Sequence, residues 1–324
     1  MGIKSTNKVE SYYNYFADSG LDAASEYIPP PSWYGNRGTW AGGYGVGGGV
    51  KNVIGYVTIP TTGNATDFGD TYQALFGASG CSNGKRGLIA GGYASGSPLN
   101  VIGYITFATT GNATDFGDLT EARRYLGGCS DAKRGVWGSG INSSGSSTNT
   151  IDYVTIATTG DASDFGNLST ATKEVGSCAS SVRGIFAGGN DGSYENEIQR
   201  ITIQTTGNAS DFGDLTISVT GLAGMSSEVG RGVFAGGWTG GGNTNVIQYI
   251  TIDNTGNATD FGDLTTATEF AAACTDGERG VIGGGTQSSV CNVIEYITVA
   301  SPGNATDFGD LLESRAYLAC SSGN

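Results

Sequence analysis

The sequence predicts an all-β, six-bladed β-propeller, and three observations support this fold class. The dipeptide Arg-Gly recurs six times, at steps of 49, 48, 49, 48 and 48 residues. Each unit holds four short apolar runs separated by turn residues, and the chain ends on a run of the type that would complete the first unit. A fixed period of this size indicates a repeat architecture, and four strands in about 40–50 residues make one propeller blade.

The four runs of a unit are clearest in the fifth unit. The first run covers residues 233–235 and is closed by a glycine pair, the second covers 246–252, the third lies around 261–264, and the fourth covers 270–274. Short runs rich in Val, Ile, Thr and Tyr and bounded by Gly, Asn and Asp are typical of strands. None of these runs has the length or the 3.6-residue spacing of a helix.

The two ends of the repeat region predict that the ring closes by strand pairing. The chain finishes on a run of the fourth type at residues 311–320, whereas the repeat region opens at Arg37 with a run of the first type. We therefore expect the C-terminal strand to complete the blade that begins at Arg37, so that the propeller covers residues 37–324. Closure of this kind removes the free sheet edges that an open array would expose.

The glycines and aromatic residues resemble those of kelch repeats, in which a strand ends in Gly-Gly, a tyrosine follows in the next strand and a large aromatic lies beyond the turn. The glycine pairs are Gly42-Gly43, Gly91-Gly92, Gly188-Gly189, Gly236-Gly237 and Gly284-Gly285; the tyrosines are Tyr56, Tyr104, Tyr153, Tyr249 and Tyr296; the aromatics are Phe68, Phe116, Phe165, Phe212, Phe261 and Phe308. Two units depart from the pattern, at Gly138-Ser139-Gly140 and at Arg200. The resemblance covers about residues 37–324 and implies the fold rather than one function, since propellers host unrelated activities.

The composition excludes several classes of function. A net charge of −14 argues against binding to nucleic acid or to an anionic membrane. No stretch approaches 18 apolar residues, so we expect neither a membrane span nor a secretory signal. The chain has no histidine, which removes Ser-His and Cys-His nucleophiles, most zinc sites and the copper site of galactose-oxidase-like kelch enzymes.

We expect no enzyme activity, no cofactor and no metal. Glycosidase chemistry that uses only carboxylates remains open in principle. However, the aspartates repeat in every unit, whereas an active site needs one asymmetric group of residues.

The six cysteines are expected to be free, and five of them are expected to be buried thiols near the propeller axis. We place five of them in one register of successive blades, with Met225 filling roughly that place in the remaining unit: Cys81, Cys129, Cys178, Cys274 and Cys320. Equivalent positions in neighbouring blades should lie beyond the Cα separation of about 7 Å that a disulfide allows. Cys291 lies in a variable loop.

The segment TGNATDFGDL is the most regular part of the repeat. Its first aspartates are Asp67, Asp115, Asp164, Asp211, Asp260 and Asp307, and the repeated arginines are Arg37, Arg86, Arg134, Arg183, Arg231 and Arg279. A structural turn is favoured over three functional interpretations of this segment. A calcium loop would need the alternating oxygen ligands and terminal glutamate of an EF-hand, and an Asp-box would need serine where the segment has alanine. Glycosylation would need asparagine in every unit, whereas the third unit has Asp161, which keeps the turn and destroys the glycosylation sequence. We expect each arginine to pair with, or hydrogen-bond to, a turn from this segment.

The candidate binding face is the face opposite the repeated arginines and the TGNATDFGDL turns. Its loops differ in length and sequence between units, whereas the strands of the units are nearly the same. The aromatic candidates are Tyr44, Tyr93, Tyr194 and Trp238, and the charged candidates from neighbouring connections are Arg123, Arg124, Lys173, Glu269 and Arg315. Aromatic and small polar loops suit sugars or protein surfaces. The alternative is that these loops are merely tolerant of variation.

Residues 1–36 differ in composition from the repeats and are expected to form a docking arm followed by a proline-rich spacer. The arm is rich in apolar and aromatic residues, namely Val9, Tyr12, Tyr13, Tyr15 and Phe16. We favour docking into another protein over folding back onto the ring, because a closed propeller needs no further cover.

The Gly/Thr/Asn-rich units resemble kelch-like repeats of predicted structural proteins of marine and cyanobacterial phages. This resemblance implies a non-enzymatic virion protein, fixed by its arm to other virion proteins of the capsid or tail and presenting its variable face to a host surface or a neighbouring subunit. The alternatives are a soluble carbohydrate- or protein-binding kelch propeller, cytoplasmic or extracellular, and a cellular kelch adaptor.

Overall fold

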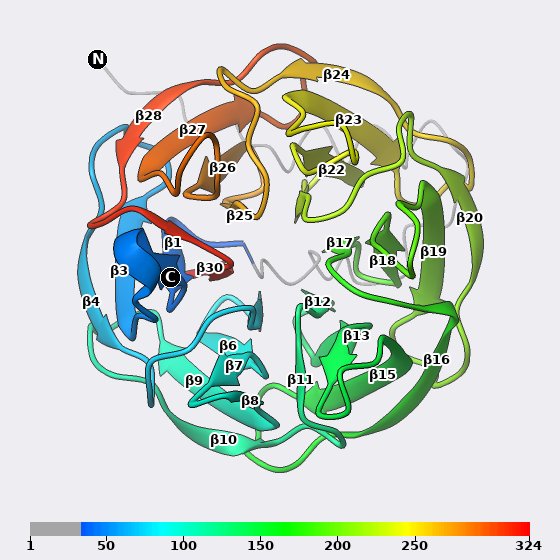
Figure 1. The fold of residues 1–324 in the computed structure, drawn as a ribbon, viewed down its shortest axis with the longest axis horizontal. Coiled ribbons are helices and arrows are strands. Elements are labelled where there is room, and N and C mark those ends of the chain that lie inside the picture. Colours follow the sequence, from blue (N-terminus) through cyan, green and yellow to red (C-terminus); the bar gives the residue numbers. More distant parts are fainter. Residues whose placement is uncertain (1–33) are drawn as a thin grey trace, which may run out of the picture. The chain divides into compact units, whose positions relative to one another are not determined.

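The computed structural model describes residues 34–324 as six four-stranded antiparallel sheets arranged around one axis (Figure 1). The predicted all-β six-bladed propeller is therefore confirmed. Residues 1–33 of the expected arm, with Val9, Tyr12, Tyr13, Tyr15 and Phe16, lie outside the described residues.

Each blade contributes an inner strand at the axis, then a second, a third and an outer strand (Figure 1). The inner strands are β30 (Ala319–Gly323), β5 (Ser79–Ser82), β12 (Gly127–Ser130), β17 (Gly176–Ala179), β21 (Ala223–Ser226) and β25 (Ala272–Thr275), and the second strands are β1 (Arg37–Ala41), β6 (Arg86–Ala90), β13 (Arg134–Gly138), β18 (Arg183–Ala187), β22 (Arg231–Ala235) and β26 (Arg279–Gly283). The third strands are β3 (Val53–Thr58), β9 (Val101–Thr106), β15 (Thr148–Thr155), β19 (Glu197–Thr202), β23 (Val246–Thr251) and β27 (Val293–Thr298), and the outer strands are β4 (Thr66–Asp70), β10 (Thr114–Asp118), β16 (Ser163–Thr172), β20 (Ser210–Asp214), β24 (Thr259–Asp263) and β28 (Thr306–Asp310). We number the blades 1 to 6 from β1.

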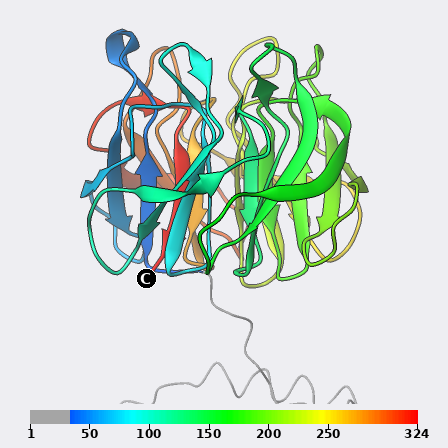
Figure 2. The same ribbon diagram turned by 90° about the horizontal axis from the view of Figure 1, so that it is seen from below.

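Short pieces of structure lie in the connections between these strands. They are β2 (Tyr44–Gly45) with β29 (Arg315–Ala316), β7 (Tyr93–Ala94) with β8 (Ser97–Pro98), β11 (Arg123–Arg124) with β14 (Ile141–Asn142), and the 3-10 turn η1 (Val46–Gly48). We call the face with the connections between second and third strands the loop face, and the opposite face the terminal face (Figure 2).

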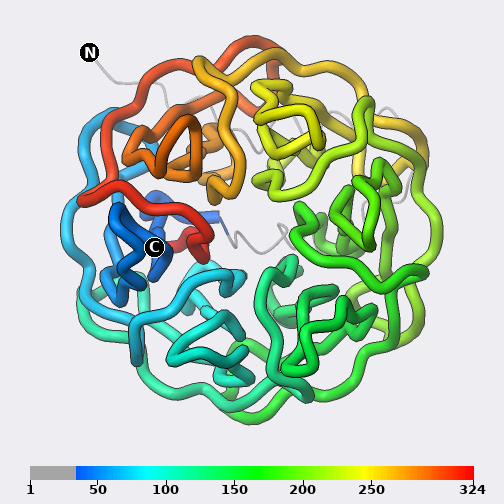
Figure 3. The backbone as a smooth tube through the Cα atoms, viewed as in Figure 1, coloured from blue at the N-terminus to red at the C-terminus, as the bar shows by residue number. Residues whose placement is uncertain are grey.

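The ring closes between its two ends, as predicted. The inner strand β30 pairs with β1 in antiparallel register, with Arg37 opposite Gly323 and Ala41 opposite Ala319. Figure 3 shows the last and first segments of the described chain side by side in blade 1. The Asn36 amide donates to Asn324 Oδ1 at 2.7 Å, so the described chain begins and ends together on the terminal face.

Every outer strand is covered by the turn that precedes the outer strand of the next blade. At the first junction, the Gly111 amide donates to the Phe68 carbonyl at 2.7 Å, and the Ala113 amide donates to the Asp70 carbonyl at 2.7 Å. Between these two bonds, Asn112 Oδ1 accepts from the Asp70 amide at 3.0 Å. The same side-chain acceptor occurs at all six junctions, from Asn64, Asn112, Asp161, Asn208, Asn257 and Asn304.

This junction explains why Asp161 replaces asparagine in the third unit. The junction uses only a side-chain oxygen as acceptor, which aspartate supplies as well as asparagine does. The expected structural role of the segment therefore includes a bridge between blades, and the bridge removes the exposed edge of each outer strand.

The repeated arginines also join neighbouring blades. Each one donates from Nη1 to a backbone carbonyl at the end of a third strand in the next blade; for example, Arg134 reaches Ile203 O at 3.0 Å and Arg183 reaches Ile252 O at 2.9 Å. These backbone carbonyls lie just before the TGNATDFGDL segment, so the arginines bond the end of the preceding strand and not the expected turn of the segment itself. Five of the six guanidinium groups also lie over a tyrosine ring of their own blade, as Arg231 does over Tyr249 at 4.3 Å.

The glycine of each Arg-Gly dipeptide makes room for a side chain of the preceding blade. A Cβ atom at Gly135 would lie 2.7 Å from Cys81 Sγ, and one at Gly184 would lie 2.9 Å from Cys129 Sγ. Burial raises the pKa of the Cys129 thiol to about 12, which keeps it protonated at neutral pH. The six cysteines are free, as expected.

Cys320 does not share the register of the other four inner-strand cysteines, which corrects the prediction. Ser321 lies opposite Thr39 in β1, as Cys81 lies opposite Leu88 in β6, and Cys320 lies opposite Trp40 instead. The connection itself has the usual length, since Ser321 follows Asp310 of the preceding outer strand by eleven positions, as Cys81 follows Asp70. The cysteine stands one position earlier in the strand, ten residues after Asp310. Cys320 consequently lies against Cys274 of the preceding blade, beside the cavity at the axis.

Candidate binding site

Six equivalent residues form a ring around the axis on the loop face, where the chain passes from each outer strand to the next inner strand. We call them the mouth ring: Gly77, Tyr125, Glu174, Gly221, Phe270 and Tyr317. All six have left-handed backbone conformations, with φ between 54° and 68°. This conformation costs a non-glycine residue on the order of 1–2 kcal/mol, and four of the six are not glycine.

The mouth ring is closed by its own backbone hydrogen bonds. Each amide donates to the carbonyl of the equivalent residue in the preceding blade, and the six N–O distances lie between 2.6 and 3.0 Å. The left-handed conformation therefore directs both backbone groups along the circumference. Two glycines also give space to neighbouring rings, since a Cβ at Gly77 would lie 2.8 Å from the Tyr125 ring and one at Gly221 would lie 2.5 Å from the Phe270 ring.

One half of the mouth is an aromatic cluster. The rings of Phe270 and Tyr317 stack at 4.1 Å, and the ring of Tyr125 lies 5.4 Å from that of Tyr317. Phe76 is the centre of the cluster, with ring centroids 5.4 to 6.2 Å from those of four tyrosines, which are Tyr44, Tyr93, Tyr125 and Tyr317. Edge and offset contacts of this kind stabilise aromatic groups against one another.

A single arginine borders the aromatic cluster. The Arg124 guanidinium lies 4.3 Å from the ring centre of Tyr93 and 5.0 Å from that of Tyr125. A cation placed over aromatic faces is held without neutralising its charge, so the guanidinium can still bind an acidic group.

The other half of the mouth is acidic. Glu174 Oε2 accepts from Thr220 Oγ1 at 3.0 Å, and burial raises the pKa of this carboxyl. Burial, together with the charge of Glu174, also raises the pKa of Glu269. Below the ring lies a cavity of about 120 Å³, whose walls include small residues of the inner strands and Cys320.

Three of the nine predicted binding-face residues meet at the aromatic cluster, namely Tyr44, Tyr93 and Arg124. Two others form a separate pair, in which Trp238 Nε1 donates to Tyr194 Oη at 3.2 Å. Lys173 and Glu269 are half-buried at the rim of the loop face. Their amides donate to the carbonyls of Asn190 and Thr286, which lie in the connections between the second and third strands of blades 4 and 6.

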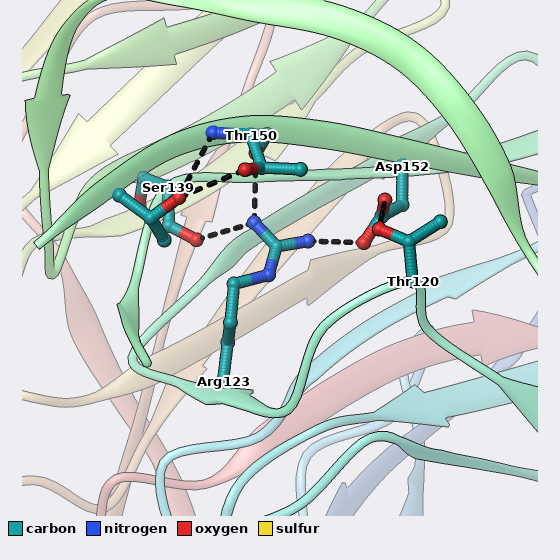
Figure 4. A network of polar contacts seen from close by, with 6 residues as sticks. Thr120, Arg123, Ser139, Thr150 and Asp152 are labelled. Atoms are coloured by element: carbon teal, nitrogen blue, oxygen red, sulfur yellow. Dashed lines mark hydrogen bonds and ion pairs between the residues drawn. The ribbon is translucent and has the colours of Figure 1, made fainter. Parts of the chain in front are cut away.

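Arg123 was expected on the binding face but is fully buried. Its Nη1 donates to the carbonyls of Ser139 at 2.8 Å and Thr150 at 2.7 Å, and its Nη2 pairs with Asp152 (Figure 4). Thr120 donates to the second oxygen of Asp152. Arg123 is therefore a structural residue that binds the carbonyls beside the turn of the third blade.

The prediction that Arg315 lies on the binding face is also wrong. It is fully buried, and its Nη1 donates to the carbonyls of Gly42 and Val53, each at 2.7 Å. Neither arginine is available to a ligand on the binding face, because both side chains turn inward beneath the turn that ends a second strand.

Sequence reasoning did not select four residues of this site, namely Phe76, Tyr125, Phe270 and Tyr317. The sequence does contain a signal for this ring. Each mouth-ring residue lies seven positions after the last residue of the Asp-Phe-Gly-Asp motif of its unit, or of Asp-Phe-Gly-Asn in the third unit. That position holds glycine, tyrosine, glutamate and phenylalanine in different units, so it gives no visible repeat.

The fold and site together define a six-bladed β-propeller with an aromatic and acidic mouth on one face. No protein-family model matches the chain, and no curated protein matches it at a significant level. Between residues 34 and 324, no three His, Cys, Asp or Glu side chains gather as a metal site. Within the same part of the chain, no helix is long and apolar enough to cross a membrane.

Proposed function

We propose that this chain is a non-enzymatic structural protein of a bacteriophage particle that presents the mouth of its propeller to a host surface or a neighbouring subunit. The principal observation is that the ends of the described chain and the candidate binding site lie on opposite faces of the propeller. The described chain starts and ends on the terminal face, where Asn36 bonds Asn324, whereas the mouth and the variable connections lie on the loop face (Figure 2). A protein held by the segment before residue 34 can therefore keep its loop face free.

The rigidity of the ring supports a presenting role. Each junction between blades has backbone bonds at the outer strands, an asparagine or aspartate bridge and an arginine bond, and the mouth ring closes the loop face. Rigid scaffolds that display variable loops on one face are common among binding proteins. The Gly/Thr/Asn-rich repeats, which resemble those of predicted phage structural proteins, support the virion setting.

The test is immunogold electron microscopy of purified phage particles from the source of the protein, with an antibody raised against the propeller. The proposal expects label at a fixed place on the capsid or tail of most particles. Bare particles, alongside label on free protein in the same lysate, would contradict it.

A soluble carbohydrate-binding propeller is the second candidate. The observation in its favour is the exposure of aromatic side chains on the loop face, since Tyr44 and Tyr194 are each 37% exposed and Trp238 lies beside Tyr194. Such side chains provide flat surfaces on which a sugar ring can stack. Glycan-array binding that is lost in Trp238→Ala and kept in Val182→Ala, a control on an exposed apolar residue, would support this candidate.

A further inference from the structure

Two equivalent arginines in the connections to the inner strands allow a direct comparison of buried charge. Arg123 and Arg315 each follow the last residue of the preceding outer strand by five positions, and each donates from Nη1 to two backbone carbonyls of the next blade. Both side chains are fully buried. Arg123 also has a carboxylate, since its Nη2 pairs with Asp152 (Figure 4).

Arg315 bonds no carboxylate within the described part of the chain, residues 34–324. The position of Asp152 is occupied in blade 1 by Gly55, because Gly55 lies opposite Trp40 as Asp152 lies opposite Trp137. Among residues 34–324, Nε and Nη2 of Arg315 are buried without a hydrogen-bond partner, whereas only Nε lacks one in Arg123. Removal of the partner from a buried charge is normally very unfavourable.

Glu313 is the acidic side chain whose charge acts on Arg315, but neither Nε nor Nη2 of Arg315 bonds it. Its Oε2 binds Lys51 at 2.6 Å, and its Oε1 is buried without a hydrogen-bond partner among residues 34–324. Burial lowers the pKa of Arg315 to about 10, so the guanidinium stays protonated at neutral pH. The charge of Arg315 therefore persists, and blade 1 has no side chain at the position from which Asp152 reaches Arg123.

The side chain of Leu312 lies next to Gly55 and is partly exposed. Leu312 replaces the Thr120 of the other site, is 43% exposed, and would lie 3.3 Å from a Cβ at Gly55. The corresponding glycine of blade 2, Gly103, is filled more tightly, since a Cβ there would lie 2.8 Å from the Tyr72 ring. The preceding connection of that blade also has leucine where the arginine would be.

We propose that Arg315, Gly55 and Leu312 form a binding site for a small monovalent anion, of chloride or formate size, which takes the place of the carboxylate that Asp152 supplies to Arg123. The anion accepts from Nη2 and Nε of Arg315 and enters beneath Leu312. The site lies between blades 6 and 1, where the ring closes, so its occupation stabilises the closed propeller.

The first test is thermal unfolding of the full chain at constant ionic strength, with chloride exchanged for gluconate, which is too large for the site. We expect the midpoint to rise by about 2 °C for each tenfold increase in chloride above its dissociation constant. A midpoint that follows ionic strength alone, with no difference between the two anions, would overturn the proposal.

A matched pair of variants tests the residues. Gly55→Asp should supply the carboxylate permanently, so its midpoint should be higher in gluconate and indifferent to chloride. Gly103→Asp places the same group at the equivalent position without an arginine, and should keep the chloride dependence of the parent protein. Chloride dependence that persists in Gly55→Asp would place the anion elsewhere and refute the assignment.

Crystals of the unaltered protein grown in bromide decide the matter even if Gly55→Asp does not fold. The proposal requires an anomalous bromide peak within hydrogen-bond distance of Arg315 Nη2 or Nε. Bromide found only at exposed positions would refute it.

Discussion

Replacement of Glu295 by glutamine is expected to remove a pH dependence from the stability of the propeller. Glu295 occupies the third-strand position that holds glutamine in blades 4 and 5, at Gln199 and Gln248. Its side chain is 6% exposed, and its Oε1 accepts from the amide of Thr265 at 3.1 Å and from the hydroxyl of the same residue. Burial raises the pKa of Glu295 from 4.5 to about 7, against the opposing effect of the bond from Thr265.

The magnitude follows from the difference in pKa between the folded and unfolded chain. A rise from 4.5 to about 7 corresponds to an upper limit of about 3.4 kcal/mol, at about 1.36 kcal/mol for each pKa unit. Residual hydration of the carboxylate reduces this to about 1–2 kcal/mol. Because the folded pKa is raised, the stabilising contribution is fully present below pH 4.5 and is lost as the pH rises through 7.

Glutamine keeps the acceptor oxygen for Thr265 and never ionises. The advantage of Glu295→Gln over the parent protein should therefore be about 1–2 kcal/mol larger at pH 8 than at pH 5, as measured by urea unfolding at both pH values. Gln248→Glu is the reciprocal control and should introduce a second dependence of the same sign. An advantage that is equal at pH 5 and pH 8 would refute the reasoning.

Substitutions at three further positions test the framework by denaturant unfolding. Ser139→Gly should stabilise the protein by about 1 kcal/mol, because Ser139 has φ of 68° where other blades have glycine and its buried hydroxyl has no hydrogen-bond partner within residues 34–324; a loss of stability would contradict this. Asn112→Ala should cost about 1 kcal/mol through loss of the bridge to Asp70, and Asn112→Asp should be nearly neutral; equal losses would argue against the bridge. Asp152→Ala should cost about 3–5 kcal/mol because it leaves the charge of Arg123 buried alone, and a loss below about 1 kcal/mol would show that the pair is not needed.

Much of the fold could be predicted because the residues that repeat, such as the glycine pairs, fix the backbone conformation at their own positions. The glycine pairs adopt the left-handed conformations that end each second strand, as Gly42 and Gly43 do with φ of 65° and 109°. Ring closure followed from the order of runs at the two ends. The broken pair at Ser139 also keeps this geometry, which the sequence alone did not indicate.

The candidate site was harder to predict because it depends on contacts between blades. Arg123 and Arg315 looked like surface residues, since a sequence gives no sign that a charged side chain turns inward onto carbonyls. The mouth ring was missed because its side chains differ from blade to blade, and only the shared backbone conformation makes Tyr125 and Phe270 equivalent. Cys320 was assigned to the wrong register because it follows the last aspartate of the preceding repeat motif by ten residues, where Cys81 follows Asp70 by eleven, a difference that the sequence does contain.

The most direct test of the proposed function is the orientation of the propeller on the particle, determined by electron cryomicroscopy of purified phage at a resolution that distinguishes the two faces. The account predicts that the terminal face, with Asn36 and Asn324, lies toward the capsid or tail and that the mouth around Tyr317 faces outward. A propeller whose mouth is buried against the particle, or particles without a propeller, would contradict it.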